Sequence, residues 1–222
     1  VSFCNKSESR VMVRLYYMLV DYNSRFIPKE YRRSWSNQFC EPKFPCYWEK
    51  VFEELRFIDK RKRIIEVGCG QGDVTSILCY LGFMQIKAYE MDNMMCSIAI
   101  DKLNRLFGKS GIVICGKYPQ GQESADVLIL VNCAYADGCD TKVDYMKKVV
   151  SFFENAGKPE LFLLEVVDPE YNIPDENFPY CLRLNSSDIE VMFPAATIHS
   201  YETYHYPQNK RTKRLYIIKH SK

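Results

Sequence analysis

The sequence predicts an α/β protein with a mostly parallel, seven-stranded sheet, helices on both faces of that sheet and an antiparallel hairpin at the carboxyl end. Three features predict this class. Short apolar stretches alternate with amphipathic ones from about residue 64 onward, which is typical of strands that alternate with helices. A glycine-rich turn follows the first apolar stretch, and two β-rich runs close the chain. Crossovers between parallel strands are right-handed, so the alternating part is expected to form one sheet covered on both sides.

The alternating pattern gives the expected position of each element. The apolar stretches predict strands over residues 63–67, 85–90, 111–115, 125–131 and 160–167, and the closing hairpin over residues 196–206 and 213–219. The amphipathic stretches predict helices over residues 73–81, 93–107 and 141–155. Asn93 is the expected cap of the second helix. The segment Ser187-Asp188-Ile189-Glu190 predicts a capping box and a short helix before the hairpin.

The first 60 residues lie outside this pattern and are expected to form a mainly helical cap, followed by the α/β domain over residues 61–222. Apolar spacing predicts helices over residues 11–22 and 46–58, and the Pro- and Arg-rich stretch 27–45 predicts a loop. The segment holds 13 aromatic residues, among them both Trp. The chain does not begin with Met, which indicates that it was trimmed or excised from a longer one.

Composition and spacing argue against a membrane, disulfide-stapled or metal protein. No apolar run reaches the roughly 18 residues of a membrane span. Five of the ten Cys lie in the glycine-rich turn or inside predicted elements, so free thiols in a reducing compartment, and hence a cytoplasmic location, are expected. No Cys-x-x-Cys pair occurs and the three His stand near the end, so no metal site is expected.

Charge is distributed unevenly along the chain. Residues 1–63 carry 14 Lys and Arg against 8 Asp and Glu, a net charge of +6, whereas residues 64–222 carry a net charge of −4. A basic, aromatic segment can attract phosphate or nucleic acid. The alternative interpretation, a solvated helical face, is favoured.

The segment with most chemical information follows the first predicted strand and opens the first predicted helix of the alternating part. It runs Glu66-Val67-Gly68-Cys69-Gly70-Gln71-Gly72-Asp73. Glycines let the backbone turn sharply and let a ligand approach, and the N–H groups of the helix start face that ligand. The spacing is G-x-G-x-G, which argues against the G-x-G-x-x-G site of a nicotinamide dehydrogenase. Glu90, at the end of the second strand, has a carboxylate that can accept hydrogen bonds from both hydroxyls of a ribose.

From about residue 64 to 219, the chain resembles class I S-adenosylmethionine-dependent methyltransferases, a Rossmann-like family. The glycine segment is similar to the first motif of that family, E/D-x-G-x-G-x-G, and Tyr89-Glu90-Met91-Asp92 is similar to the second. The closing hairpin resembles the antiparallel last strand of these enzymes. The resemblance implies a methyltransferase whose cofactor is S-adenosyl-L-methionine.

The resemblance also implies roles for individual residues. Glu66 would organise the loop and face the methionine end, and Glu90 would bind the ribose while Met91 packs on the adenine. The cofactor would lie along the loop residues Gly68, Cys69, Gly70 and Gly72. Many members have an acid after the third strand that binds the adenine amine, but this chain has Cys115-Gly116-Lys117-Tyr118 there. Tyr118 and the backbone are therefore expected to hold the adenine.

In this fold, the loop after the fourth strand lies beside the transferable methyl group. Its sequence is Asn132-Cys133-Ala134-Tyr135-Ala136-Asp137. Enzymes that methylate amino groups of nucleic acids carry Asn/Asp-Pro-Pro-Tyr/Phe there, of which this chain keeps Asn132 and Tyr135. Asn132 is a candidate for cofactor binding, and Tyr135 and Asp137 are candidates for catalysis. The alternative, that Asn132 ends the strand and Tyr135 packs locally, is preferred.

Other candidates are less specific. Asp168 follows the fifth strand at the edge where such sheets bind ligands, and it would bind or deprotonate an acceptor or simply form a turn. Tyr171, Tyr47 and Trp48 are candidates for contacts with the acceptor, and the last two are equally well explained as core residues.

The sequence therefore predicts a methyltransferase that acts on an O or N atom of a small or medium organic acceptor. Residues 1–60 and 168–195 would enclose that acceptor. The alternative is a nucleic-acid methyltransferase acting on RNA or DNA, and a further alternative is a catalytically silent protein that binds cofactor or a partner. The acceptor and the oligomeric state do not follow from the sequence.

Overall fold

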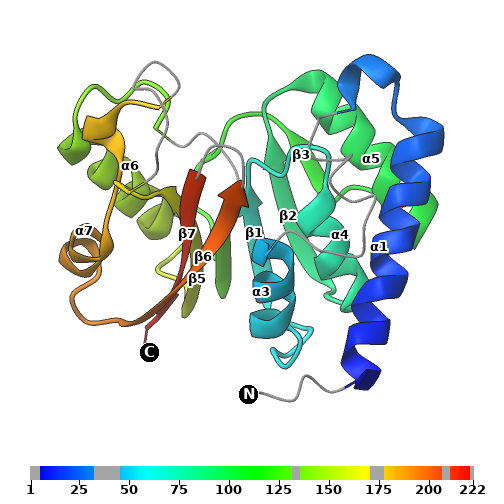
Figure 1. Ribbon diagram of the computed structural model, residues 1–222, viewed down its shortest axis with the longest axis horizontal. Coiled ribbons are helices and arrows are strands. Elements are labelled where there is room, and N and C mark those ends of the chain that lie inside the picture. Colours follow the sequence, from blue (N-terminus) through cyan, green and yellow to red (C-terminus); the bar gives the residue numbers. More distant parts are fainter. Residues whose placement is uncertain (1–5, 33–45, 132–135, 171–177, 207–210, 221–222) are drawn as a thin grey trace.

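The computed structural model describes residues 6–32, 46–131, 136–170, 178–206 and 211–220 (Figure 1). Seven strands form one sheet, and their bounds are β1 (Arg63–Val67), β2 (Gln85–Glu90), β3 (Val113–Cys115), β4 (Val127–Leu130), β5 (Leu161–Val167), β6 (Thr197–Tyr206) and β7 (Arg211–Lys219). They lie in the order β3-β2-β1-β4-β5-β7-β6. Strands β1 to β5 are parallel, and β7 pairs antiparallel with both β5 and β6. The predicted fold class is confirmed.

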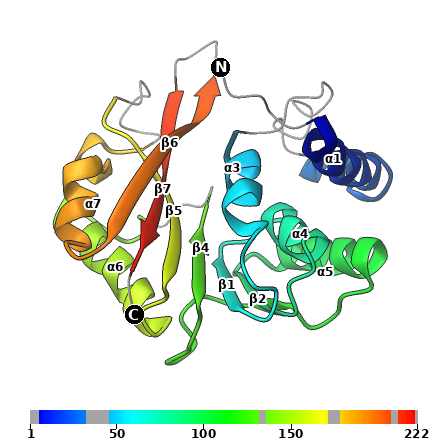
Figure 2. The ribbon, with the colours of Figure 1, turned by 90° about the horizontal axis from the view of Figure 1, so that it is seen from below.

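The helices of the described residues lie on both faces of the sheet (Figure 2). Their bounds are α1 (Lys6–Phe26), α3 (Cys46–Leu55), α4 (Asp73–Tyr80), α5 (Asn93–Phe107), α6 (Lys142–Asn155) and α7 (Ser186–Met192), with short 3-10 helices η1 (Lys29–Tyr31) and η3 (Tyr180–Leu182). Helices α6 and α7 cover one face, and α1, α3, α4 and α5 lie on the other side. None of the described helices combines the length and apolar character needed to cross a membrane.

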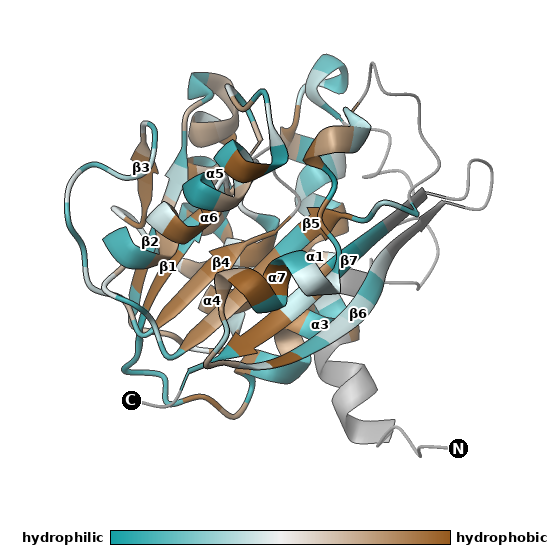
Figure 3. Cartoon of the chain, turned by 90° about the vertical axis from the view of Figure 1, so that its left-hand side faces the viewer, coloured by the Kyte–Doolittle hydropathy of each residue, from teal (hydrophilic) through white to brown (hydrophobic). Residues whose placement is uncertain are grey.

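Two apolar cores lie between the sheet and the helices, one on each face of the sheet. On the α3–α4 side, Leu19, Trp48 and Ile77 belong to one core with Leu161 and Leu163 of β5. On the α6–α7 side, Val149 and Phe152 belong with the even-numbered residues of β5 to the second core. The central strands are mostly hydrophobic, whereas the coloured part of the edge strand β6 is mostly hydrophilic (Figure 3). This difference follows from burial, because a central strand is covered on both faces.

Several local expectations need correction. The first helix is longer than the 11–22 range expected from apolar spacing, because its polar ends also take helical geometry. Asp92, not Asn93, caps α5, since its carboxylate accepts the N–H groups of Met94 and Met95. Asn185 caps α7 and forms the capping box with Asp188, so the box begins two residues earlier than expected.

The expectation that the cysteines are free thiols is wrong for one pair. Cys96 and Cys115 form a disulfide, with their Cα atoms 5.9 Å apart. The first lies in the first turns of α5 and the second ends β3, and the crossover between these elements brings the two together. Among the described cysteines, Cys69, Cys79, Cys139 and Cys181 are free.

A buried ion pair joins α4 and α5. The ammonium group of Lys102 lies 2.7 Å from the carboxylate of Asp73, and the Lys102 side chain is fully buried. The ring of Tyr22, from α1, lies beneath the same ammonium group at 5.5 Å, and the Tyr22 hydroxyl donates to Asp101 of α5. These contacts hold three helices together beside the glycine loop.

Replacing Lys102 by Met is expected to destabilise the protein by about 3–5 kcal/mol, because Asp73 would stay buried without its partner. Unfolding in urea measures this loss. Lys109→Met, at an exposed lysine just beyond the same helix, is the control and is expected to have little effect. A loss below about 1 kcal/mol in Lys102→Met would contradict the assigned role of the pair.

Candidate functional site

The glycine loop lies where the order of the sheet reverses. Strand β1 pairs with β2 on one side and with β4 on the other. The strands that follow β1 are therefore added first on the β2 side, as β2 and β3, and then on the opposite side, beginning with β4. The carboxyl ends of β1 and β4 meet at this point. In open α/β sheets, ligands bind at such a point, outside the carboxyl ends of the strands. Gly68 to Gly72 connect the end of β1 to the start of α4 there.

Three glycines give this loop its shape. Gly68, Gly70 and Gly72 have φ angles of 71°, 55° and 77°, a region that other residues rarely adopt. A Cβ on Gly72 would lie 3.1 Å from the Cβ of Ala99, so this glycine also lets α5 pack closely. A Cβ on Gly70 would meet no described atom within 4 Å. The backbone of Gly70 therefore borders space that a ligand can use.

The end of β2 supplies the hydrogen bonds that hold the loop. The carbonyl of Tyr89 accepts the N–H groups of Gly68 and Cys69, at 2.8 and 3.0 Å. The carboxylate of Glu90 accepts the N–H of Gly70 at 2.7 Å and, through its other oxygen, the N–H of Asp92 at 2.9 Å. Each carboxylate oxygen has a second lone pair, so Glu90 can accept further hydrogen bonds while it holds the loop.

Glu66 is the next-to-last residue of β1, directly before the loop, and is buried with 3% of its surface exposed. Its carboxyl group accepts the hydroxyl of Thr75 at 2.6 Å. Burial raises the pKa of Glu66 to about 8, and the neighbouring carboxylates of Asp73 and Glu90 add to this shift. The site thus holds a carboxyl group that is protonated at neutral pH in the folded chain.

Two further loop residues differ in exposure. Met91, next to Glu90, exposes 66% of its surface, so its side chain is available to a ligand. The side chain of Cys69 is buried, and burial raises the pKa of its thiol far above the ordinary range. A thiol in that state is a poor nucleophile, so Cys69 contributes packing and backbone to the loop rather than reactivity.

The glycine loop is also tied to the N-terminal segment. The side-chain amide of Gln71 is buried and donates to the carbonyl of Tyr31 in η1 at 2.9 Å. Its oxygen has no hydrogen-bond partner among the described residues. No local sequence pattern predicts this contact, because the two residues are 40 positions apart.

Two aromatic candidates lie in the core. Tyr118 is 3% exposed, its ring packs against Tyr89 and Phe152, and its hydroxyl donates to the carbonyl of Phe152. Trp48 is 1% exposed and belongs to the core between α3 and the sheet. The Tyr118 ring therefore packs in the core, and its expected contact with the adenine stays a prediction. The structure gives Trp48 the core position that was the alternative to acceptor contact.

The described acidic candidates differ in environment. Asp168 is buried, accepts the N–H of Glu170 through one oxygen, and pairs through the other with Arg214 at 3.0 Å. Both carboxylate oxygens of Asp168 thus have partners within the chain, which agrees with the turn interpretation. Asp137 is exposed between β4 and α6. Its side chain is free to face solvent or an acceptor.

Four candidates lie outside the described part of the chain: Asn132, Tyr135, Tyr171 and the side chain of Tyr47. The structure in turn adds residues that the sequence analysis missed, since Thr75, Asp92 and Arg214 each hold a candidate site residue in place. Within the described residues, no three His, Cys, Asp or Glu side chains gather in a way that would hold a metal ion.

Comparisons with known proteins add to this geometry. No protein-family model and no curated protein matches the sequence. A magnesium protoporphyrin IX methyltransferase from Synechocystis PCC 6803, solved with bound S-adenosylhomocysteine (SAH), matches with a TM-score of 0.63 and 12% identity over 96% of this chain and 100% of that chain. An S-adenosylmethionine-dependent methyltransferase from Clostridium acetobutylicum matches with a TM-score of 0.57 and 13% identity over 81% and 93% of the two chains. The small RNA methyltransferase HEN1 matches with a TM-score of 0.56 and 12% identity over 79% of this chain and 25% of that chain. The chain therefore has the fold of class I S-adenosylmethionine-dependent methyltransferases.

The raised pKa of Glu66 predicts a pH dependence of stability. The unfolded chain releases this proton near pH 4.5, whereas the folded chain keeps it to about pH 8. Because the folded state then binds more protons, the contribution of Glu66 to stability falls as the pH rises between these values. Glu66→Gln should flatten this fall, as measured by urea unfolding across the range, and the exposed Glu154→Gln should not. If the unfolding free energy of the Glu66→Gln variant falls with pH as steeply as that of the wild type, the raised pKa of Glu66 is contradicted.

Proposed function

We propose that this protein is a methyltransferase that binds S-adenosyl-L-methionine at the glycine loop and transfers its methyl group to an O or N atom of a small or medium organic acceptor. The observation that carries the proposal is the loop itself. Three left-handed glycines follow β1 at the reversal point of the sheet, and the backbone of Gly70 borders free space. Its neighbour, the Glu90 carboxylate, lies where two ribose hydroxyls would find acceptors.

The charges around the loop fit this cofactor. Glu66, Asp73 and Glu90 surround it, and only Asp73 has a buried cation as its partner among the described residues. S-adenosylmethionine carries a sulfonium and an ammonium group, so a cluster of carboxyl groups favours it. A cation near Glu66 would lower the pKa of that carboxyl group and favour its ionised form.

Binding roles then follow residue by residue. Gly68, Cys69, Gly70 and Gly72 would lie along the methionine part and Glu66 near its amino group. Glu90 would hold the ribose, and the exposed Met91 would pack on the adenine. Asn132, after β4, would complete the site. When bound, the cofactor supplies an electrophilic methyl group, and the chain has to align an acceptor lone pair with it.

A proton acceptor is needed only if the acceptor atom is a hydroxyl. Asp137 and Tyr135, in the segment after β4, are the residues that we propose for this role, and Asp137 is exposed. Asp168 is better suited to hold Arg214 in place at the end of β5. Tyr47 and Tyr171 remain candidates for contact with the acceptor.

The position of one basic run favours a small acceptor over nucleic acid. The run Lys60-Arg61-Lys62-Arg63 supplies four of the 14 Lys and Arg in residues 1–63. It lies at the amino end of β1, about 15 Å from the glycine loop at roughly 3.3 Å per residue. Lys62 pairs with Glu160 and Arg63 with Asp126, and Arg61 pairs with Asp59. These charges therefore do not form a basic track toward the proposed methyl site.

The N-terminal segment is proposed to select the acceptor. Helix α1 packs with Leu15 and Leu19 against the α4 side of the core, and η1 reaches the glycine loop through Gln71. The chain between η1 and α3, rich in Pro, Arg and aromatic residues, starts beside this loop. A segment anchored at that point is suited to cover an acceptor next to the methyl group.

Methyl transfer can be measured directly with labelled S-adenosylmethionine. Panels of small amines and hydroxyl compounds, and separately RNA and DNA, would serve as acceptors. Transfer to a small compound supports the proposal, and transfer to RNA or DNA alone supports the nucleic-acid alternative. Tight cofactor binding without any transfer across both panels would favour a silent, cofactor-binding protein.

Gly70→Ala is expected to abolish binding of SAH, as measured by isothermal titration, because its Cβ would occupy the space bordered by the loop. Gly82→Ala is the matched control. Gly82 also has a positive φ, of 85°, and open space around its Cβ, but it follows α4, away from the loop. Both variants carry the same kind of backbone strain, so a difference in their SAH affinity indicates that the ligand binds at the loop. Equal affinity in the two variants would contradict the proposed site.

Glu90→Ala is expected to weaken SAH binding by about 1–3 kcal/mol, the usual loss when hydrogen bonds to a charged group disappear. Glu90→Gln should recover part of this affinity, because its amide oxygen still accepts a hydrogen bond. Glu154→Ala, on the exposed side of α6, is the control. Isothermal titration gives all three values, and unchanged affinity in Glu90→Ala would rule out the ribose contact.

A further inference from the structure

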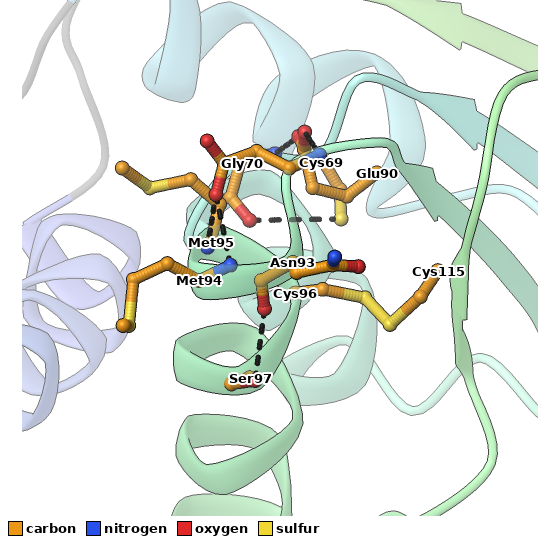
Figure 4. Close-up of a disulfide and its surroundings, with 10 residues drawn as sticks. Cys69, Gly70, Glu90, Asn93, Met94, Met95, Cys96, Ser97 and Cys115 are labelled. Atoms are coloured by element: carbon orange, nitrogen blue, oxygen red, sulfur yellow. Dashed lines mark hydrogen bonds between the residues drawn. A yellow bond between two sulfur atoms is a disulfide. The ribbon is translucent and has the colours of Figure 1, made fainter.

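The Cys96–Cys115 disulfide joins the two elements that flank the end of β2. Cys115 is the last residue of β3 and lies directly opposite Glu90 in the parallel register of β2 and β3. Cys96 lies one turn into α5, and its N–H donates to the carbonyl of Asp92, the helix cap. Figure 4 shows the sulfur–sulfur bond between the start of α5 and β3, with Gly70 and Glu90 on the loop side.

The same few residues connect this bond to the glycine loop. Glu90 accepts the N–H of Gly70 and the N–H of Asp92, so one carboxylate holds both the loop and the start of α5. The carbonyl of Glu90 accepts the N–H of Gly116, directly after Cys115. A displacement of α5 relative to β3 would therefore move partners on both sides of Glu90.

Strand β3 has few other restraints. It has three residues, stands at the edge of the sheet, and pairs only with β2. Short edge strands of this kind open at low free energy. The disulfide is the one covalent tie between β3 and the helix layer within the described residues, and it closes the chain over 19 positions.

The two sulfur-bearing residues differ in access. Cys96 is completely buried, whereas Cys115 is exposed. A soluble dithiol is therefore expected to approach the disulfide from the side of Cys115. Disulfides that an external thiol can reach are the ones that exchange.

We propose that Cys96–Cys115 is a thiol–disulfide exchange site for a dithiol reductant, and that its oxidation state sets the affinity of the glycine loop for the cofactor. The oxidised form holds β3, α5 and Glu90 in the arrangement that receives the adenosine part. Reduction releases β3 and weakens binding. This inference rests on the proposed cofactor site.

Reduction of the Cys96–Cys115 disulfide by a dithiol takes two steps. A thiolate of the dithiol attacks the sulfur of Cys115, the sulfur–sulfur bond breaks, and its electron pair leaves on Cys96, which takes up a proton. The second thiol of the reductant then attacks the reductant's own sulfur in the mixed disulfide with Cys115. Cys115 leaves as a thiol, and the reductant departs as a disulfide, so the protein gains two electrons and two protons.

The test compares SAH binding by the oxidised and the dithiothreitol-reduced protein, using isothermal titration with thiol counts from intact mass. The expected result is binding at least about fivefold weaker after reduction, the lower end of typical coupling between linked sites. Linkage requires that SAH in turn makes the disulfide harder to reduce. A fivefold effect corresponds to a midpoint potential lower by about 21 mV, because tenfold equals about 30 mV for two electrons.

Variants separate this effect from reduction elsewhere. Cys115→Ser should bind like the reduced protein and should no longer respond to dithiothreitol. Cys181→Ser, which removes an exposed free thiol, should keep the full response. Equal affinity of oxidised and reduced wild type, or free thiols at both positions before treatment, would overturn the inference and leave the proposed function intact. Absence of SAH binding in both states would overturn the proposed function and this inference together.

Discussion

The structure around the site depends on one arrangement: a turn with three left-handed glycines, in which the end of the neighbouring strand accepts the N–H groups of Gly68, Cys69 and Gly70. A loop between a buried strand and a helix leaves backbone donors without partners. Here the carbonyl of Tyr89 takes two of them and the carboxylate of Glu90 takes the N–H of Gly70. The parallel register of β1 and β2, which places Val67 opposite Tyr89, brings these groups together. The loop and the end of β2 thus form one unit, and displacing either would disturb the other.

This unit concentrates carboxyl groups in a small volume. Burial, with a smaller effect from the charges of Asp73 and Glu90, raises the pKa of Glu66 to about 8, while Lys102 of α5 pairs with Asp73. Without a bound cation, the site relieves its repulsion by holding a proton. A ligand that brings positive charge would replace that proton, so proton release should accompany binding of the proposed cofactor. The same electrostatics that destabilise the site when it is alone therefore favour a sulfonium and ammonium ligand.

The sequence predicted the elements with strong local signals and missed those that depend on distant contacts. The strands around Glu66, Glu90 and Leu163 follow from apolar runs, and the loop follows from its glycine spacing, because both are properties of adjacent residues. The positions of aromatic residues could not be predicted from the sequence, because such residues are common both in cores and in ligand sites. In the structure, Tyr118 and Trp48 lie in the core. The disulfide was missed because the packing of α5 against β3 brings the two cysteines together, and a spacing of 19 residues does not by itself predict a disulfide.

The contact between Gln71 and Tyr31 gives the N-terminal segment a place in this scheme. Helix α1 is fixed on the outside of the α4–α5 layer by buried Leu15, Leu19 and Tyr22, and the chain then turns through η1 onto the glycine loop. Anything that shifts the loop also shifts the point from which residues 33–45 depart. We therefore propose that cofactor binding and acceptor selection are coupled through Gln71, whose buried side-chain oxygen has no partner among the described residues. An unsatisfied buried acceptor is costly, so a donor supplied by the bound cofactor would stabilise this position of the loop.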